Sequence, residues 1–284
     1  MAKHTAVKTK LSLPTAPNEP PQTLIAYTTL IFGRKNVGKS TLGSSYPNSI
    51  NFQYERGRRN LEIVMLPEQG GPPLDLDNTR KYFDLVANSE FETAVIDTID
   101  AFYDMVYRGV CEENGVTKPG DGGNGAEVWR EVAQTVEDLL GVIQDAGKSL
   151  VLISHEKEKS HNNSDGTSLE RLEPSCTGQA TGVIQRMCDN VFHYDWVAND
   201  RVMTLRSPDN LVWTSIGLDS DRFLDPDGEP LRRIVIPNDP TKGYETLNKA
   251  FENKLRDYDW EPPKPVKSPK NTSSNSQRPK STKK

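Results

Sequence analysis

Residues 24–40 read LIAYTTLIFGRKNVGKS, an apolar and β-branched run that passes directly into a glycine-rich turn containing a lysine. The run from Leu24 to Phe32 is nearly continuous in apolar character, which is typical of a strand buried on both faces of a parallel sheet. The turn from Gly33 to Ser40 matches the pattern G-x-x-x-x-G-K-[ST] at every fixed position. A strand that leads into this loop predicts an α/β fold with a phosphate-binding site.

The loop composition indicates how phosphate would be bound. Glycines let the chain curl so that successive backbone N–H groups converge on phosphate oxygens, at the start of the following helix. Lys39 would reach the β- and γ-phosphates of ATP, and the Ser40 hydroxyl would bind Mg²⁺. The alternative is a glycine-rich turn that binds no ligand. The residues expected to bind ATP are Gly33, Arg34, Lys35, Asn36, Val37, Gly38, Lys39, Ser40 and Thr41.

Strand and helix patterns alternate along the rest of the chain. Further strands are expected at residues 49–53, 93–96, 149–153 and 191–197, and helices at 78–88 and 126–145. Beyond these, residues 201–206 and 211–215 flank a Pro-Asp-Asn turn and predict an antiparallel hairpin, followed by a strand at 233–236 and a helix at 244–255. We therefore expect an α/β P-loop fold whose mostly parallel five-stranded sheet carries helices on both faces and a small antiparallel extension.

The ends of the chain differ from the middle in composition and charge. Residues 1–22 and 257–284 are rich in proline and polar residues, so we expect a disordered arm, a folded domain at 23–256 and a disordered basic tail. Residues 261–284 carry +6 and residues 1–22 carry +2, which leaves −13 for the stretch between them in a chain of net charge −5. This balance argues against a protein that binds nucleic acid over its whole surface, but it allows a local basic groove.

Cysteine use and hydropathy indicate the compartment. Cys111, Cys176 and Cys188 are odd in number and never spaced as C-x-x-C, which argues against a disulfide framework or a zinc site. No apolar run approaches the roughly 18 residues of a membrane span, and the N-terminus has no signal-peptide core. We expect a cytoplasmic protein with no membrane partner.

A Mg²⁺ ion held by Ser40 needs a carboxylate at the end of a neighbouring strand. Asp97 meets this need because it ends the apolar run Ala94-Val95-Ile96. The alternative is that Asp97 caps the helix that starts near Thr98, a position that aspartate favours.

Glu55 lies just past the second strand and is a second candidate carboxylate. A carboxylate there would polarise the water that attacks the γ-phosphate. The alternative is a surface glutamate paired with Arg56, Arg58 or Arg59. Simple phosphotransferases usually place the strand of the Mg²⁺-binding carboxylate next to the P-loop strand, whereas many NTP-driven motors insert another strand between the two. Order along the chain leaves this adjacency open.

Four motifs resemble, in order, those of the RecA recombinase core, and more closely those of phage-encoded RecA-like ATPases that act in single-strand annealing. They are GRKNVGKS at 33–40, Glu55, VIDTID at 95–100 and VLISHE at 151–156. The resemblance spans residues 23–196. It implies that Glu55 is the catalytic glutamate and that His155, where the recombinase has glutamine, senses the γ-phosphate. It also implies DNA-binding loops at about 108–125 and 156–179.

The resemblance implies a Mg²⁺-dependent ATPase that binds single-stranded DNA in recombination or strand annealing, with Lys39, Glu55, Asp97 and His155 as its catalytic residues. It further implies a homo-oligomer and, as another partner, a single-strand-binding protein. Two alternatives remain. One is a nucleotide-gated interaction protein with no role on nucleic acid, and the other is a small-molecule kinase, which Glu55 and the absence of an arginine-rich lid disfavour.

The basic residues of the second loop do not form a strong DNA signature. Its cationic side chains are offset by nearly as many carboxylates; the two sets are Lys157, Lys159, His161 and Arg171, and Glu156, Glu158, Asp165, Glu170 and Glu173. Trp129 is interpreted as the anchor of its helix rather than as a base-stacking platform. Candidates for reaching the γ-phosphate of a neighbouring subunit are Arg201, Arg206 and Arg222.

Overall fold

The computed structural model describes most of the predicted domain. The described residues are 13, 15–55, 61–121, 123, 125–162, 168–176, 178–217, 221–239 and 242–256. The tail predicted at 257–284 and most of the arm predicted at 1–22 lie outside them, as do Arg56, Arg58, Arg59 and Asp165.

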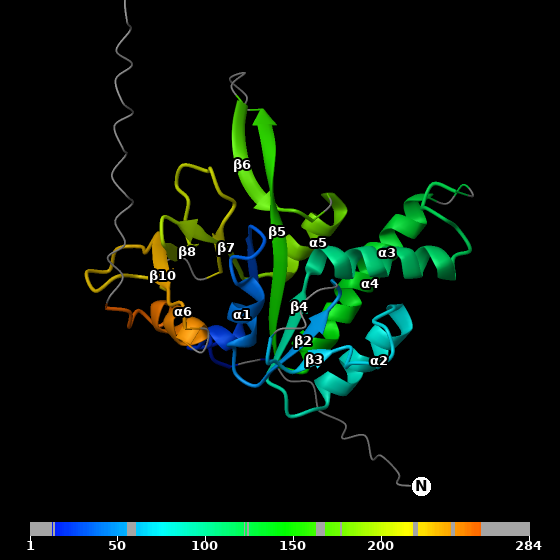
Figure 1. The fold of residues 1–284 in the computed structure, drawn as a ribbon, viewed down its shortest axis with the longest axis horizontal. Helices are drawn as coiled ribbons and strands as arrows, with labels where there is room; N and C mark the ends of the chain where they lie inside the picture. Colours follow the sequence, from blue (N-terminus) through cyan, green and yellow to red (C-terminus); the bar gives the residue numbers. More distant parts are fainter. Residues whose placement is uncertain are drawn as a thin grey trace, which may run out of the picture.

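One mostly parallel sheet forms the centre of the fold (Figure 1). Its parallel strands, within the described part of the chain, are β1 (Thr29–Gly33), β2 (Ser49–Gln53), β3 (Met65–Leu66), β4 (Thr93–Asp97), β5 (Ser149–Asn162) and β7 (Asn190–Val197). In space they follow the order β7-β1-β5-β4-β2-β3. The predicted α/β class and the five predicted parallel strands are confirmed, and the short β3 at the edge is additional.

The first strand begins later than the sequence predicts. Leu24–Ala26 forms a 3₁₀ turn instead of strand, and β1 starts only at Thr29. Leu24 is completely buried, and its backbone N–H donates to the side-chain oxygen of Asn248, 2.9 Å away, in the C-terminal helix α6 (Gly243–Phe251). The apolar residues of this segment therefore belong partly to the packing of that helix, a long-range contact that a local pattern does not reveal.

The antiparallel extension exists, but the predicted pairing is wrong. Strand β8 (Asp200–Thr204) pairs with β7 and with β10 (Arg233–Ile236), while β9 (Ser215–Ile216) pairs with β7. Val197 and Asp200 pair across a two-residue connection in which Ala198 has a φ of 54°. That tight turn fixes β8 beside β7, because two-residue loops with positive φ are the favoured hairpin connections.

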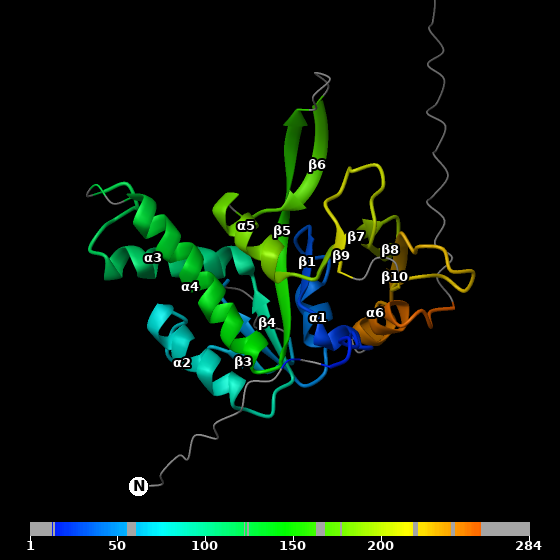
Figure 2. The same cartoon turned by 180° about the vertical axis from the view of Figure 1, so that it is seen from behind.

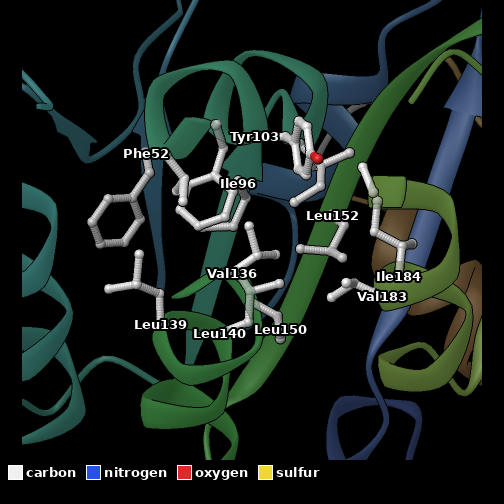
Figure 3. Packing of buried hydrophobic residues seen from close by; sticks show 14 of the residues in the cluster. Phe52, Ile96, Tyr103, Val136, Leu139, Leu140, Leu150, Leu152, Val183 and Ile184 are labelled. Carbon is white, nitrogen blue, oxygen red and sulfur yellow. The ribbon is translucent and has the colours of Figure 1, made fainter. Parts of the chain in front are cut away.

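Helices cover both faces of the sheet. They are α1 (Lys39–Ser44), α2 (Leu76–Ala87), α3 (Ile99–Glu113), α4 (Gly125–Asp145), α5 (Gly178–Met187) and α6. The apolar stripe predicted for α4 is buried. Figure 3 shows its residues Val136, Leu139 and Leu140 packed beside the strand residues Ile96 and Leu150. The other face is covered by α1 and α6. None of the helices in the described part of the chain is long and apolar enough to cross a membrane.

Strand β5 continues well past the sheet and forms an arm. Its distal half pairs antiparallel with β6 (Ser168–Pro174), and the two strands project from the body in both views (Figures 1 and 2). The loop predicted at 156–179 is therefore a two-stranded arm followed by the start of α5. The other predicted loop, at 108–125, is shorter than expected because α3 extends to Glu113. The arm strands were not predicted because they are rich in charged residues and lack the apolar pattern from which strands are normally recognised.

Candidate functional site

The glycine-rich loop has the close approaches that its sequence predicts. Gly38 has a φ of 101°, a conformation that residues with a side chain rarely adopt. A Cβ atom at Gly33 would lie 1.9 Å from the backbone oxygen of Tyr194, so only glycine fits there. Strand β1 and helix α1 hold the loop on either side, as the motif requires.

Lys39 is the most deeply placed charge of the loop. Its side chain is only 3% exposed, and its ammonium donates to the backbone oxygens of Gly33 at 2.7 Å and Arg34 at 2.6 Å. A buried ammonium is costly unless oxygens surround it, and the loop carbonyls supply them. Phosphate oxygens would be stronger acceptors for the same ammonium, because hydrogen bonds between two charged groups are the stronger ones.

Asp97 and Ser40 fit the predicted Mg²⁺ site by burial and by donor chemistry. Asp97 is completely buried at the end of β4, and Ser40 is buried at the start of α1. A carboxylate and a hydroxyl are hard oxygen donors of the kind that Mg²⁺ prefers. The capping alternative fails, because Thr98 is the N-cap of α3 and its hydroxyl accepts from the backbone N–H of Ala101. A bound Mg²⁺ would neutralise phosphate charge.

Glu55 and His155 lie in direct contact, although 100 residues separate them. His155 Nε2 lies 3.0 Å from Glu55 Oε1, and the Thr98 hydroxyl donates to the same oxygen at 2.8 Å. Because a carboxylate only accepts, the neutral tautomer that fits carries its proton on Nε2. His155 Nδ1 is then an acceptor, and it is buried with no hydrogen-bond partner in the described part of the chain. The two residues form one unit beside the loop.

Strand order brings these residues to one edge of the sheet. Strand β5 lies between β1 and β4, so another strand separates the P-loop strand from the strand of Asp97. The register places His155 opposite Gly33, Ile153 opposite Asp97, and Gln53 on the other side of Asp97. The carboxyl ends of β1, β2, β4 and β5 therefore meet at the loop, which is where open α/β sheets bind ligands.

Arg34 connects the loop to the root of the arm. Its guanidinium lies 2.8 Å from Asp195 Oδ2 of β7 and 3.5 Å from Glu156 Oε1 of β5. Glu156 also contacts His193 Nε2, 2.7 Å away. Burial raises the pKa of Glu156, but the hydrogen bond from His193 and the charges of His193, Arg34 and Lys39 outweigh it and leave the pKa below its ordinary value. Consecutive residues at the arm's root, His155 and Glu156, thus contact Glu55 and the loop.

Asp100 is a site residue that sequence reasoning missed. The sequence indicated only a carboxylate in the first turn of α3, where such groups are common. In the structure its Oδ1 accepts from the hydroxyls of Ser154 and Ser175, and its Oδ2 accepts from the backbone N–H of His155 at 3.3 Å. Asp100 therefore holds β5 and the residue directly after β6 together at the arm's root. Its position next to VIDT is the available signal, but the partners come from distant segments.

Two of the arginines considered for reaching a neighbouring subunit have partners within their own chain. Arg206 donates to three backbone carbonyls, those of Phe223, Leu231 and Arg222, and is a structural residue of its own chain. Arg222 donates to Gln22 at 2.8 Å and stacks on Phe251. Neither position favours a reach toward a neighbouring subunit.

Arg201 and Trp129 also have partners within the chain. Arg201 stacks 4.7 Å from the centre of the Trp196 ring and donates to the Asn238 side chain at 3.0 Å, beside the chain's own Gly38. Trp129 packs against Tyr107 of α3 with ring centres 5.4 Å apart. The interpretation of Trp129 as a helix anchor agrees with this contact.

Comparison with known proteins identifies the family. A family model described as an AAA domain matches residues 25–212, which contain the loop, Glu55, Asp97 and His155. This chain belongs to the AAA domain family. It is a P-loop ATPase domain of the RecA-like type, and the resemblance predicted from the four motifs is confirmed. The family assignment covers nucleotide binding and ATPase chemistry in general.

Two individual relatives illustrate the distance to known proteins. The chain is 24% identical over 134 residues to YorG, an uncharacterized protein derived from the SPbeta prophage of Bacillus subtilis (strain 168); the match covers 45% of this chain and 40% of YorG. The matched part of this chain thus spans less than half of the length of YorG. A KaiC-like protein, PH0186, from Pyrococcus horikoshii OT3 is similar in structure with a TM-score of 0.39 and 14% identity, over 76% of this chain and 88% of that one.

Proposed function

We propose that this AAA-family protein is a Mg²⁺-dependent ATP hydrolase that acts, as a homo-oligomer, on single-stranded DNA in recombination or strand annealing. The observation that carries the proposal is the contact between Glu55 and His155 at the root of the arm. It joins a carboxylate placed to activate water with the strand that leaves the ATP edge of the sheet. A single-strand-binding protein is a further partner that the proposal includes.

The strand order supports hydrolysis over transfer to a second small substrate. In simple phosphotransferases the P-loop strand and the strand of the Mg²⁺-binding carboxylate are usually neighbours, but here β5 separates β1 from β4. Glu55 adds a candidate general base at the end of β2, held by His155 and Thr98. Water is therefore the acceptor that this arrangement favours, and the kinase alternative loses support.

Binding to single-stranded DNA needs cationic side chains that can contact phosphate, and those of the arm already have partners. Lys157 donates to the backbone oxygens of Ser175 and Cys176, while Lys159 and Arg171 both contact the buried carboxylate of Glu173. These cations are already engaged within the arm, so they favour weak phosphate contacts at most. The segment 261–284, which carries +6, is then the stronger candidate for binding a polyanion.

Deleting Glu261–Lys284 is expected to weaken binding to single-stranded DNA and to leave basal ATP hydrolysis unchanged. Seven lysines and arginines are lost with this segment, whereas every proposed site residue is retained. Each phosphate contact on a single strand contributes about 0.7 to the slope of log affinity against log salt, so the slope should fall by up to about 5. Fluorescence anisotropy with a labelled oligonucleotide, over a salt series, measures both quantities.

A full-length variant in which those seven cations are replaced by glutamine is the matched control, because it separates charge from chain length. It should bind DNA as weakly as the truncated protein. If the truncated protein keeps the wild-type affinity and slope, DNA contact through the tail is contradicted. If neither protein binds DNA, the nucleotide-gated interaction protein becomes the better description.

A further inference from the structure

The arm formed by residues 156–162 and 168–174 has two faces of opposite charge. Directly opposed residues of an antiparallel pair share a face, and successive residues alternate between faces. By register, one face carries Lys157, Lys159, His161, Leu169, Arg171 and Glu173, and the other carries Glu156, Glu158, Ser160, Asn162, Ser168, Glu170, Leu172 and Pro174. The first set is called the basic face and the second the acidic face. The near balance of charge along the sequence hides this separation.

The basic face is organised around one buried carboxylate. Glu173 is 5% exposed and contacts Lys159, His161 and Arg171. Burial raises its pKa, but the hydrogen bonds from Arg171 and His161 and the charges of Arg171 and Lys159 outweigh it, so the pKa lies below its ordinary value. Lys159 and Arg171 are directly opposite each other, a like-charge pair that one carboxylate only partly offsets. The face retains a net positive charge.

The acidic face has the reverse imbalance. Glu158 and Glu170 are both exposed, and neither carboxylate has a side-chain hydrogen bond or ion pair within the described part of the chain. The register makes them diagonal neighbours, about 7–8 Å apart in an antiparallel pair, so their charges repel. Glu156, at the root, differs from them because it contacts Arg34 and His193.

The position of the arm indicates that its faces are covered in the working protein. Figures 1 and 2 show the two strands extending beyond the sheet and helices. A two-stranded hairpin without a packed face is at best marginally stable in water. Near the root, Leu172 pairs with Val212, which covers part of the β6 edge and leaves the faces rather than the edge for a partner.

We propose that this arm is a self-assembly surface, in which the acidic face of one copy packs on the basic face of a second copy. Nucleic acid would match only the basic face and would be repelled by the other. A second copy satisfies both faces, and because the two faces differ, the contact is head-to-tail and repeats into a ring or filament. The inference rests on the oligomer of the proposed function but not on DNA binding or hydrolysis, which are measured separately.

Reversing the charge of each face and measuring the mass of the resulting assemblies tests the proposal. Glu158→Lys/Glu170→Lys makes both faces basic, and Lys159→Glu/Arg171→Glu makes both faces acidic. Each variant alone is expected to weaken assembly at least about tenfold in sedimentation velocity, because like charges then face each other across the contact. An equimolar mixture of the two should assemble again, because each face of one variant then meets an oppositely charged face of the other. ATP binding reports that each variant is folded.

The control is Asp84→Lys/Glu90→Lys, which makes the same change in net charge at exposed carboxylates away from the arm. It should assemble like the wild-type protein. Four outcomes overturn the proposal: a monomeric wild-type protein with and without ATP and Mg²⁺, single-face variants that assemble normally, a mixture that does not recover, or a control that fails equally. ATP hydrolysis and DNA binding are measured separately on the wild-type protein. Each of the four outcomes therefore leaves those two parts of the proposed function standing.

Discussion

Lys39→Ala is expected to lower ATP hydrolysis on the order of 10²- to 10³-fold or more, the range seen when one group that stabilises developing negative charge is removed. The ammonium is buried against the carbonyls of Gly33 and Arg34, where phosphate would replace those carbonyls as its partner. Nucleotide affinity should fall as well. Phosphate release under saturating ATP and titration with a fluorescent ATP analogue measure the two effects.

Lys148→Ala is the matched control for this variant. Lys148 also donates to a backbone carbonyl, that of Ser89 at 2.6 Å, but it lies just before the start of β5, whereas His155 lies midway along that strand. Its loss removes the same kind of hydrogen bond without touching the loop, so hydrolysis should remain near the wild-type rate. Normal turnover in Lys39→Ala would contradict the assignment of residues 33–40 as the phosphate site.

Glu55→Gln is expected to reduce hydrolysis on the order of 10²- to 10⁴-fold while ATP still binds. The amide keeps the size of the side chain and an oxygen for Thr98 and His155, but it cannot take a proton from water. Single-turnover hydrolysis and equilibrium ATP binding separate the chemical step from binding. Glu62→Gln, at an exposed carboxylate that follows the same strand, is the matched control and should hydrolyse ATP normally.

Comparison with Asp97→Asn sharpens the assignment of Glu55. If Asp97 holds Mg²⁺, its amide variant should require more Mg²⁺ for half-maximal hydrolysis, whereas Glu55→Gln should keep the wild-type Mg²⁺ requirement. A Mg²⁺ titration of both variants distinguishes the two roles. Wild-type hydrolysis by Glu55→Gln would contradict the catalytic assignment and renew support for a kinase.

The sequence predicts the centre of this fold well because its signals are local. The strands at Ser49–Gln53 and Thr93–Asp97 and the buried stripe of α4 follow from runs and periodicities of adjacent residues. Features decided by distant partners were missed. The segment at Leu24 turns because it packs on α6. The pairing of β8 with β7 was missed for another reason, because it depends on the backbone conformation of the tight turn at Ala198.

The residues of the candidate site also fall into those that local motifs predict and those that depend on strand order. The loop, Lys39 and Asp97 are encoded in short motifs, and the structure brings them to one edge of the sheet. The contact of Glu55 with His155 and the role of Asp100 depend on strand order, which the order of residues along the chain does not determine. The separation of charge on the arm depends on register, so a count of charges predicted only near neutrality.

Phosphate release with and without an unstructured oligonucleotide tests the proposed ATP hydrolysis on single-stranded DNA most directly. In Mg²⁺ and saturating ATP, the wild-type protein should release phosphate at a basal rate that the oligonucleotide raises severalfold, and Lys39→Ala should lower both rates at least about 10²-fold. Added salt should reduce the stimulation more than the basal rate, because DNA contact is electrostatic. A basal rate that no oligonucleotide changes, at any salt concentration, would contradict the proposed action on single-stranded DNA.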